Sequence, residues 1–118
     1  MFETLFKALG EPTRLKIIKL LAERELCVCD LEEIMQFSQP RISQHLKVLK
    51  QSGLVIERKE GQRSICSLNT ELLNNTMQGF REYIVKPLGD IPELSEEYCR
   101  LTNLDGESCT RKFCKTEI

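Results

Sequence analysis

Hydrophobic residues recur along the first half of the chain with the spacing of amphipathic helices, at intervals of three and four residues. This pattern predicts four helices, over residues 2–9, 13–24, 29–37 and 39–52. The side chains expected to face the core are Phe2, Leu5, Phe6, Leu9, Leu15, Ile18, Leu21, Ala22, Leu31, Ile34, Met35, Ile42, Leu46 and Leu49. Gly10 and Pro12 separate the first two helices, Ser38 is a good N-cap for the fourth, and Gly53 ends it.

The second half of the chain begins with a change to short strand-like segments. Two strands are expected, over Leu54–Lys59 and Arg63–Leu68, with a turn at Glu60–Gln62 between them. A fifth helix, capped by Thr70, then carries one apolar stripe and ends before Pro87, and a shorter sixth helix follows. The stripe residues of these two helices are Leu73, Met77, Phe80 and Ile84, then Leu94, Tyr98 and Leu101.

Two short helices, a tight connection and a two-stranded wing define a winged helix-turn-helix, a mainly α fold with a β-hairpin wing (α+β). We expect one domain over residues 1–104 and a flexible, cysteine-containing tail over residues 105–118. The stripes of the first and fifth helices have no evident partner inside so small a fold. A symmetric homodimer would cover both of them.

The charge of the 118-residue chain is unevenly distributed. The chain is 41% apolar and 30% charged, with a formal net charge of −1, as in a globular protein. Residues 38–64 nevertheless carry six basic and only two acidic side chains. A local basic surface is sufficient for DNA binding, because only the face near the phosphates must be positive.

The helix over 39–52 is the expected recognition helix. Its polar side offers side chains that reach base edges and phosphates, namely Gln39, Arg41, Ser43, Gln44, Lys47 and Lys50. His45, the single histidine, lies at the edge of the buried stripe, where either a core-edge or a DNA-facing position is possible. The wing would contact the DNA backbone or minor groove through Arg58, Lys59 and Arg63. Double-stranded DNA is therefore the expected partner.

The six cysteines are the second source of chemistry. Neither a secretory signal nor a membrane span is visible, so we expect a cytoplasmic protein with no membrane partner. In a reducing compartment, metal ligands or redox thiols are more frequent than disulfides. Cys27 and Cys29 are the strongest candidates. Positions i and i+2 of a helix point to nearly opposite sides, so one ion held by both thiolates requires an extended or distorted first turn. Metal binding is therefore expected to strain or unwind the start of the third helix.

The other four cysteines carry weaker expectations. Cys66 is expected as a buried filler on the second strand, and Cys99 as a core or dimer-interface residue. Cys109 and Cys114 lie on the tail, and either is a possible third sulfur ligand.

Several motifs together resemble the ArsR/SmtB family of metal-sensing repressors, over roughly residues 2–86. They are Ala8-Leu9-Gly10-Glu11-Pro12-Thr13-Arg14-Leu15, Glu25-Leu26-Cys27-Val28-Cys29-Asp30-Leu31, Ser38-Gln39-Pro40-Arg41-Ile42-Ser43-Gln44-His45-Leu46, Gly53-Leu54-Val55 and Arg58-Lys59-Glu60-Gly61. The resemblance implies a homodimeric repressor that leaves its operator when an inducer binds. It also gives the DNA-reading positions to Gln39, Arg41, Ser43, Gln44 and His45.

The cysteine motif is similar to that of the arsenic- or cadmium-sensing branch of this family, with two departures. The third cysteine of the arsenic-sensing pattern is replaced by Glu32, and an aromatic residue of the wing is replaced by Cys66. The family's other sensor site uses histidine on the last helix, and no histidine follows residue 45. A zinc-type site there is therefore not expected.

The sequence is compatible with three kinds of inducing signal. The leading hypothesis is a repressor released by As(III) or Sb(III) through cysteine thiolates, with no resident cofactor required. The alternatives are Cd(II) or Pb(II) as inducer, and a thiol-based redox sensor on the same scaffold. An enzyme is not expected, because the chain lacks a Cys-x-x-Cys motif and a phosphate-binding glycine loop.

Overall fold

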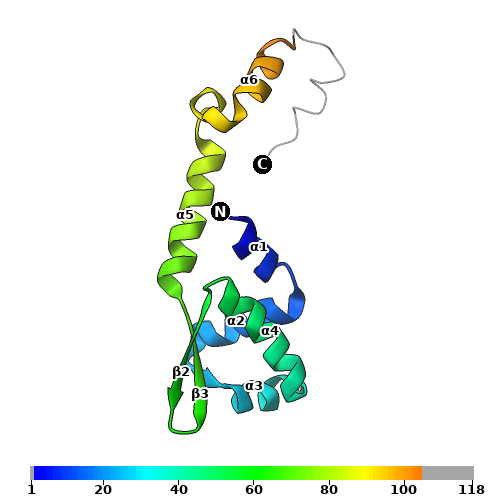
Figure 1. Ribbon diagram of the computed structural model, residues 1–118, viewed down its shortest axis with the longest axis vertical. Helices are drawn as coiled ribbons and strands as arrows, with labels where there is room; N and C mark the ends of the chain where they lie inside the picture. The colour runs from blue at the N-terminus through cyan, green and yellow to red at the C-terminus, as the bar shows by residue number, and fades with distance from the viewer. Residues whose placement is uncertain (1, 105–118) are drawn as a thin grey trace. The chain divides into compact units, whose positions relative to one another are not determined.

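The computed structural model of the protein describes residues 2–104, whose contacts divide the chain into two compact units at Arg81 and Glu82 (Figure 1). The first unit contains α1 (Glu3–Leu9), α2 (Pro12–Glu23), β1 (Leu26–Cys27), α3 (Val28–Met35), α4 (Gln39–Gln51), β2 (Val55–Glu60) and β3 (Arg63–Leu68). Helix α5 (Thr70–Val85) begins in this unit and ends in the second. The second unit also contains two 3-10 turns, η1 (Leu88–Asp90) and η2 (Pro92–Leu94), and α6 (Ser95–Thr102).

The helix boundaries follow the capping signals in the sequence. The Ser38 hydroxyl accepts the Arg41 N–H at 3.4 Å and caps α4, as predicted. Gly53, directly after this helix, has φ of +85°, a conformation that favours glycine. The predicted cap of α5 is wrong by one residue. Asn69 rather than Thr70 accepts the Leu72 N–H, at 3.1 Å.

One hydrophobic core joins the helices of the first unit to the sheet. Its fully buried members include Ile17, Leu31, Ile42, Leu49 and Leu54. Three predicted core residues of these helices are instead exposed, namely Leu15 at 53%, Ile34 at 50%, and Ala22. In α2 the buried face runs through Ile17, Ile18 and Leu21, which turns Leu15 to the outside.

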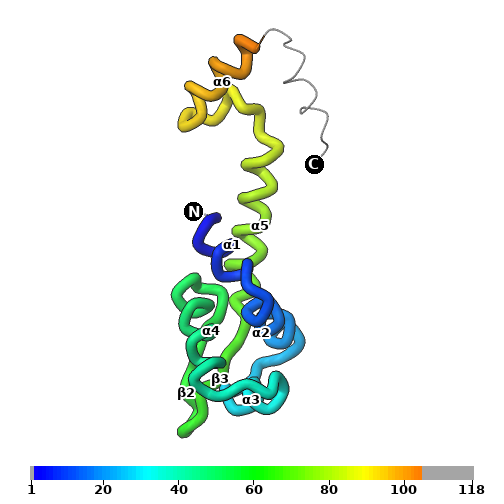
Figure 2. Tube along the Cα trace, turned by 90° about the vertical axis from the view of Figure 1, so that its right-hand side faces the viewer, coloured from blue at the N-terminus to red at the C-terminus, as the bar shows by residue number. Residues whose placement is uncertain are grey.

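The sheet has three antiparallel strands in the order β1–β3–β2. β2 and β3 form the predicted wing hairpin, joined by Gly61, with φ of +66°, and Gln62. The two-residue strand β1 was not predicted; in it Cys27 lies opposite Ile65, and Leu26 lies opposite Cys66. Figures 1 and 2 show the tip of the hairpin at the same end of this unit as α3.

The middle of α5 packs against α1 and the residue before it through an aromatic cluster. The ring of Phe80 meets those of Phe6 and Phe2 edge to face, with centroids 4.9 Å and 5.7 Å apart. The expectation that both stripes lack a partner within the chain is therefore wrong for this stretch. Towards the end of the same helix, Ile84 is 53% exposed and Val85 is also exposed, so part of the α5 stripe is uncovered.

In the second unit, the 3-10 turns pack against α6. Gly89 leaves room for the Tyr98 ring, because a Cβ at position 89 would lie 3.2 Å from it. Cys99, on α6, is exposed, so its predicted place in a core is wrong. Within the described part of the chain, no helix is both long enough and apolar enough to cross a membrane.

Candidate metal centre and nucleic-acid interface

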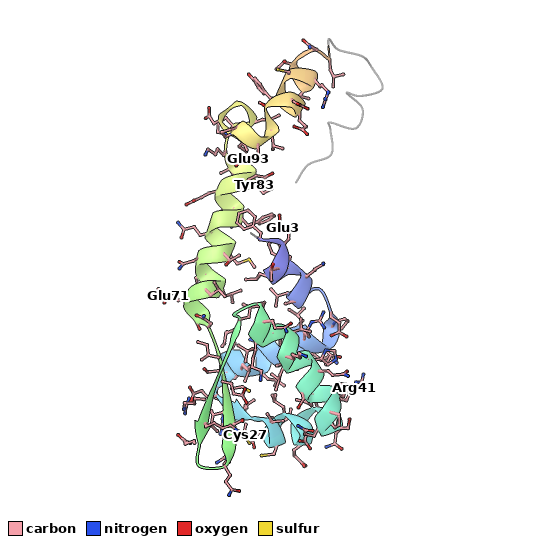
Figure 3. The ribbon with its side chains drawn as sticks, viewed as in Figure 1. Glu3, Cys27, Arg41, Glu71, Tyr83 and Glu93 are labelled. Atoms are coloured by element: carbon pink, nitrogen blue, oxygen red, sulfur yellow. The ribbon has the colours of Figure 1, made fainter. Side chains whose placement is uncertain are left out.

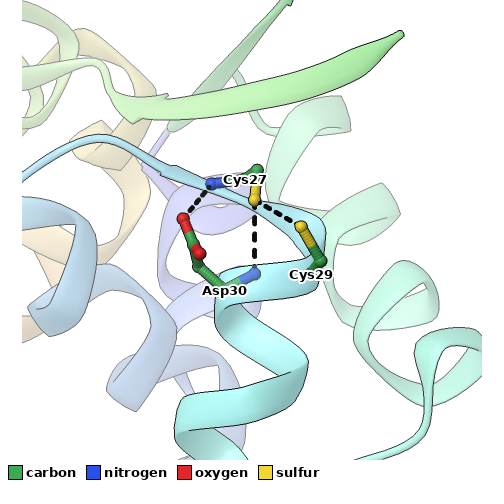
Figure 4. Close-up of side chains that lie close together, drawn as sticks. All are labelled: Cys27, Cys29 and Asp30. Atoms are coloured by element: carbon green, nitrogen blue, oxygen red, sulfur yellow. Dashed lines mark hydrogen bonds between the residues drawn. The ribbon is translucent and has the colours of Figure 1, made fainter.

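Cys27 and Cys29 lie where the sheet ends and α3 begins. Cys27 is the last residue of β1 and the N-cap of α3, with extended backbone at φ of −84° and ψ of 166°. Its Sγ atom is 2.6 Å from the Sγ of Cys29, and both cysteines are free (Figure 4). Cys27 is buried and Cys29 is exposed, so the pair can be reached from solvent through Cys29.

Because i and i+2 diverge on a regular helix, one ion held by both cysteines was predicted to need an extended or distorted first turn. The structure has the extended form of this turn. In the structure Cys27 precedes the helix in an extended conformation, and only Cys29 is helical. The two sulfur atoms therefore lie together before any ligand binds.

Asp30 completes the site through a capping box. The Asp30 N–H donates to Cys27 Sγ at 3.3 Å, and the Cys27 N–H donates to Asp30 Oδ2 at 3.1 Å. A cysteine thus occupies the place where such boxes usually have serine or threonine. The sequence analysis missed the role of Asp30, although an acidic residue three positions after a cap is a known signal for this motif.

The surroundings shift the pKa values of the two thiols in opposite directions. Burial raises the pKa of Cys27, but hydrogen bonds from Cys29, from Arg63 and from the Asp30 N–H outweigh it, and the net shift is downward. The pKa of Cys29 is raised, mainly by its hydrogen bond to Cys27. Cys27 is therefore the sulfur that more readily becomes a thiolate, the form that binds soft metals.

The ligand atoms of Cys27, Cys29 and Asp30 all lie within 4.8 Å of one another. Two sulfurs and one carboxylate oxygen form an incomplete set for an ion that prefers three sulfurs. These residues therefore fit a soft metal or metalloid as a bidentate sulfur site that needs one further ligand.

The remaining cysteines do not join this cluster within the described chain. Cys66 is fully buried, as predicted, and burial raises the pKa of its thiol. Because Cys66 lies opposite Leu26 while Cys27 lies opposite Ile65, the two cysteines point to opposite faces of the sheet. Cys109 and Cys114 lie outside the described residues.

The predicted DNA-reading side chains lie on the outer side of α4, with Arg41 labelled in Figure 3. The Arg41 guanidinium carbon is 3.8 Å from the centroid of the Phe37 ring, a cation–π contact that limits its motion. Gln39 Nε2 donates to Ser43 Oγ at 2.7 Å, while Gln44 and Lys47 are exposed. The role of Phe37 as a platform for Arg41 was not predicted.

His45 lies on the side of α4 that faces the start of α2. Its side chain is 17% exposed, and its Nδ1 atom lies 3.5 Å from an Arg14 nitrogen and 3.9 Å from Glu11 Oε1. Arg14 in turn donates to the Ala8 carbonyl at 2.7 Å. His45 therefore occupies a core-edge position among α1, α2 and α4.

Two of the three predicted wing cations are paired with acidic groups that flank Cys27. Arg58 donates to Glu25 at 2.8 Å and also lies 3.5 Å from Glu60. Arg63 lies 4.0 Å from Asp30 Oδ2. Lys59, between them on the hairpin, is exposed and makes no ion pair in the part of the chain that the structure describes.

Comparisons with known proteins agree with this arrangement. Residues 11–57 match the family model described as "Bacterial regulatory protein, arsR family". The chain is 41% identical over 106 residues to the arsenical resistance operon repressor of Staphylococcus xylosus, covering 90% of this chain and 93% of that protein. It is 54% identical over 59 residues to the arsenical resistance operon repressor of Escherichia coli, covering 49% of this chain and 50% of that protein.

Solved structures show the same fold. A structure described as a possible transcriptional regulator for arsenical resistance superposes with a TM-score of 0.60 at 30% identity, covering 80% of this chain and 93% of that one. HlyU from Vibrio cholerae superposes with a TM-score of 0.57 at 36% identity, covering 69% of this chain and 89% of that one.

The recognition helix, the wing and these similarities define a winged helix-turn-helix transcriptional regulator, not an enzyme. The chain belongs to the ArsR family of bacterial regulatory proteins, in its arsenic branch. It is a DNA-binding repressor, as the sequence motifs predicted.

Proposed function

We propose that this repressor binds operator DNA as a homodimer and is released when Cys27 and Cys29 bind As(III) or Sb(III). The observation that carries this proposal is the 2.6 Å separation of their sulfur atoms at the junction of β1 and α3. Two thiols of one chain thus form a ready bidentate site for a soft ion. Relatives named arsenical resistance operon repressors support the choice of inducer.

The reaction of arsenous acid with the two thiols releases water and needs no other reactant. Each thiol gives up a proton and displaces one hydroxyl of arsenous acid as water, which forms one As–S bond without oxidation or reduction. The third sulfur would come from Cys109 or Cys114, or from a small thiol in solution. The exposure of Cys29 supports access for either source.

Release of DNA would follow from the position of Cys27 in the fold. Its backbone pairs with β3 of the wing, and its sulfur caps α3, which packs against the recognition helix α4. Replacing the S–H bond by an S–As bond fixes the orientation of this sulfur, which changes its hydrogen bond from the Asp30 N–H and thereby the start of α3. The disturbance therefore reaches both DNA-binding elements from one atom.

For the DNA contacts, we propose that the recognition helix enters the major groove and the wing contacts the backbone. The residues assigned to this interface are Gln39, Arg41, Ser43, Gln44, His45, Lys47, Arg58, Lys59 and Arg63. Arg41 is the strongest candidate for a base contact, because its contact with Phe37 holds it in place beside the exposed face of α4.

The homodimer is supported by the apolar residues that remain exposed at the end of α5, Ile84 and Val85. A two-fold dimer would cover them and present two recognition helices to paired half-sites. Since its operator is chromosomal or plasmid DNA, we place the protein in the cytoplasm.

Two alternative inducers each have an observation in their favour. The Asp30 carboxylate beside the two sulfurs favours Cd(II) or Pb(II), which accept mixed donor sets more readily. The closeness of two free thiols also favours a redox sensor, in which an oxidant joins Cys27 to Cys29 as a disulfide.

One titration separates these functions. The reduced protein on its operator is titrated with arsenite, antimonite, Cd(II), Pb(II) and hydrogen peroxide, and DNA release is followed by fluorescence anisotropy. We expect release at the lowest concentration with arsenite or antimonite. Release by peroxide alone would assign the redox function, and no release by any of the five would overturn the proposal.

A further inference from the structure

Arg63 reaches from the wing to the candidate metal centre. It is the first residue of β3, beside the hairpin turn, and lies opposite Glu60 of β2. Its guanidinium lies 4.0 Å from Asp30 Oδ2. Asp30 in turn exchanges two hydrogen bonds with Cys27, at 3.1 Å and 3.3 Å. One cation of the wing is therefore linked to the sulfur of Cys27 through Asp30.

Arg58 and Arg63 both link the wing to the segment around Cys27, but only Arg63 contacts a residue of the cysteine site. Arg58 also ties the wing to the segment around Cys27, but its partners are Glu25 and Glu60, which are not part of the cysteine site. Binding of an ion by the cysteines leaves both of these carboxylates unchanged. For Arg63, in contrast, the same event disturbs its partner Asp30, whose N–H donates to the Cys27 sulfur.

We propose that Arg63 is the positioning residue that transmits occupancy of the Cys27–Cys29 site to the wing. This inference rests on the proposed function and names how that site is regulated. In the free protein, the hydrogen bonds between Cys27 and Asp30 hold the Asp30 carboxylate beside the Arg63 guanidinium and so fix the hairpin against the start of α3. When the Cys27 sulfur bonds to arsenic, its hydrogen bond from the Asp30 N–H changes, Asp30 shifts, and Arg63 loses its contact with the carboxylate.

The loss of one partner loosens the wing at its tip, next to the turn at Gly61 and Gln62. The orientation of the hairpin is then less well fixed, so its cations contact the DNA phosphates less often. Because phosphate contacts do not depend on sequence, affinity falls for all DNA sequences. In this mechanism Arg63 affects DNA binding mainly through the orientation of the wing.

The test compares Arg63→Gln with Arg63→Lys and with Lys59→Gln, a wing cation outside the cysteine site. For each, the operator dissociation constant is measured with and without arsenite, and the ratio of the two is the coupling. A ratio of about 5–150-fold is typical of allosteric coupling. We expect Arg63→Gln to lower the wild-type ratio at least about fivefold, Arg63→Lys to keep most of it, and Lys59→Gln to leave it unchanged.

A second readout needs no DNA. Amide hydrogen exchange in β1 and β3 of the wild type should become faster when arsenite is added, and free Arg63→Gln should already show the faster rate. If Arg63 contacts only phosphates, Arg63→Gln weakens binding equally with and without arsenite, and this inference is overturned. A wild type that does not respond to arsenite overturns the proposed function as well, so the two failures can be told apart.

Discussion

Cys27 and Asp30 cap each other across the first turn of α3, each accepting a hydrogen bond from the other's backbone N–H. The sulfur of Cys27 therefore has a structural task besides any ligand binding. Serine performs this capping task at least as well as cysteine. A serine at position 27 thus removes the metal-binding chemistry without removing the cap.

The first prediction follows from this relationship. Cys27→Ser and Cys29→Ser should each fold normally and bind the operator like the wild type. Each should lose release by arsenite, because one remaining thiolate cannot chelate. Thermal unfolding, operator anisotropy and an arsenite titration measure the three properties on the same samples.

Cys99→Ser is the matched control, since Cys99 is exposed and lies on α6. It should respond to arsenite like the wild type. For Cys109→Ser and Cys114→Ser we expect a weaker but surviving response if either supplies the third sulfur. X-ray absorption at the arsenic edge shows which cysteines bind the ion. The same three-sulfur shell in the wild type and in Cys27→Ser would place the sensor in the tail cysteines.

The second prediction concerns the recognition helix. Arg41→Ala and Gln44→Ala should each weaken operator binding by about 1–3 kcal/mol if they contact bases. Arg41→Lys tests the type of contact, since lysine keeps the charge but loses the planar donor pair. Competition with unrelated DNA measures the loss of specificity, and unchanged operator affinity in both alanine variants would mean that α4 is not the reading helix.

The third prediction concerns the wing. Lys59→Ala should weaken binding to all DNA sequences alike and should reduce the slope of log affinity against log salt by about one. Lys16→Ala, an exposed lysine of α2, is the control and should leave that slope unchanged. A sequence-dependent effect of Lys59→Ala would point to base contact in the minor groove.

The fourth prediction concerns assembly. Sedimentation at micromolar concentration should show a dimer of the 13.7 kDa chain, with or without arsenite. Ile84→Asp should yield monomers with weak operator binding, because it places a charge in the proposed apolar interface. Ile34→Asp is the control, since Ile34 on α3 is exposed to nearly the same extent. Dimers that persist in Ile84→Asp would remove the end of α5 from the interface.

The fifth prediction concerns how the free energy of unfolding depends on pH. The Cys27 N–H lowers the pKa of Asp30 in the folded state, while an aspartate in the unfolded chain has a pKa of about 3.9. The ionised carboxylate therefore stabilises the fold above about pH 4, and this contribution is lost as pH falls through the lower folded pKa. Urea unfolding should show a shallower decline in acid for Asp30→Asn, whose amide oxygen can still accept the N–H. Cys27→Ser keeps that N–H and should decline like the wild type.

The sequence predicted the helices and the wing well, because each has a long enough periodic pattern or a clear breaker. The spacing of Ile42, Leu46 and Leu49 identified the buried face of α4, and Ser38 identified its start. The family motifs likewise located the recognition helix, and the pair Cys27–Cys29 pointed to the candidate metal centre.

What the sequence did not predict depends on contacts between distant segments. Strand β1 has only two residues, so it carries no periodicity, and it exists because β3 offers it an open edge. The same strand holds Cys27 in an extended conformation before α3, and this pairing is why the sequence alone did not show how close the two sulfurs lie. Likewise, the pairing of Arg58 and Arg63 with Glu25 and Asp30 depends on the fold of the hairpin beside α3.

The adjacency of the two sulfurs also sets a threshold for the dose of inducer. Once one thiol has captured a soft ion, the second acts as if present at an effective concentration of millimolar or more, because it is tethered nearby. Small thiols in the surroundings compete with the chain for the same ions, and a lone cysteine would hold no advantage over them. Under the proposed function, the geometry at Cys27 and Cys29 would therefore let the repressor respond to traces of inducer against a background of free thiols.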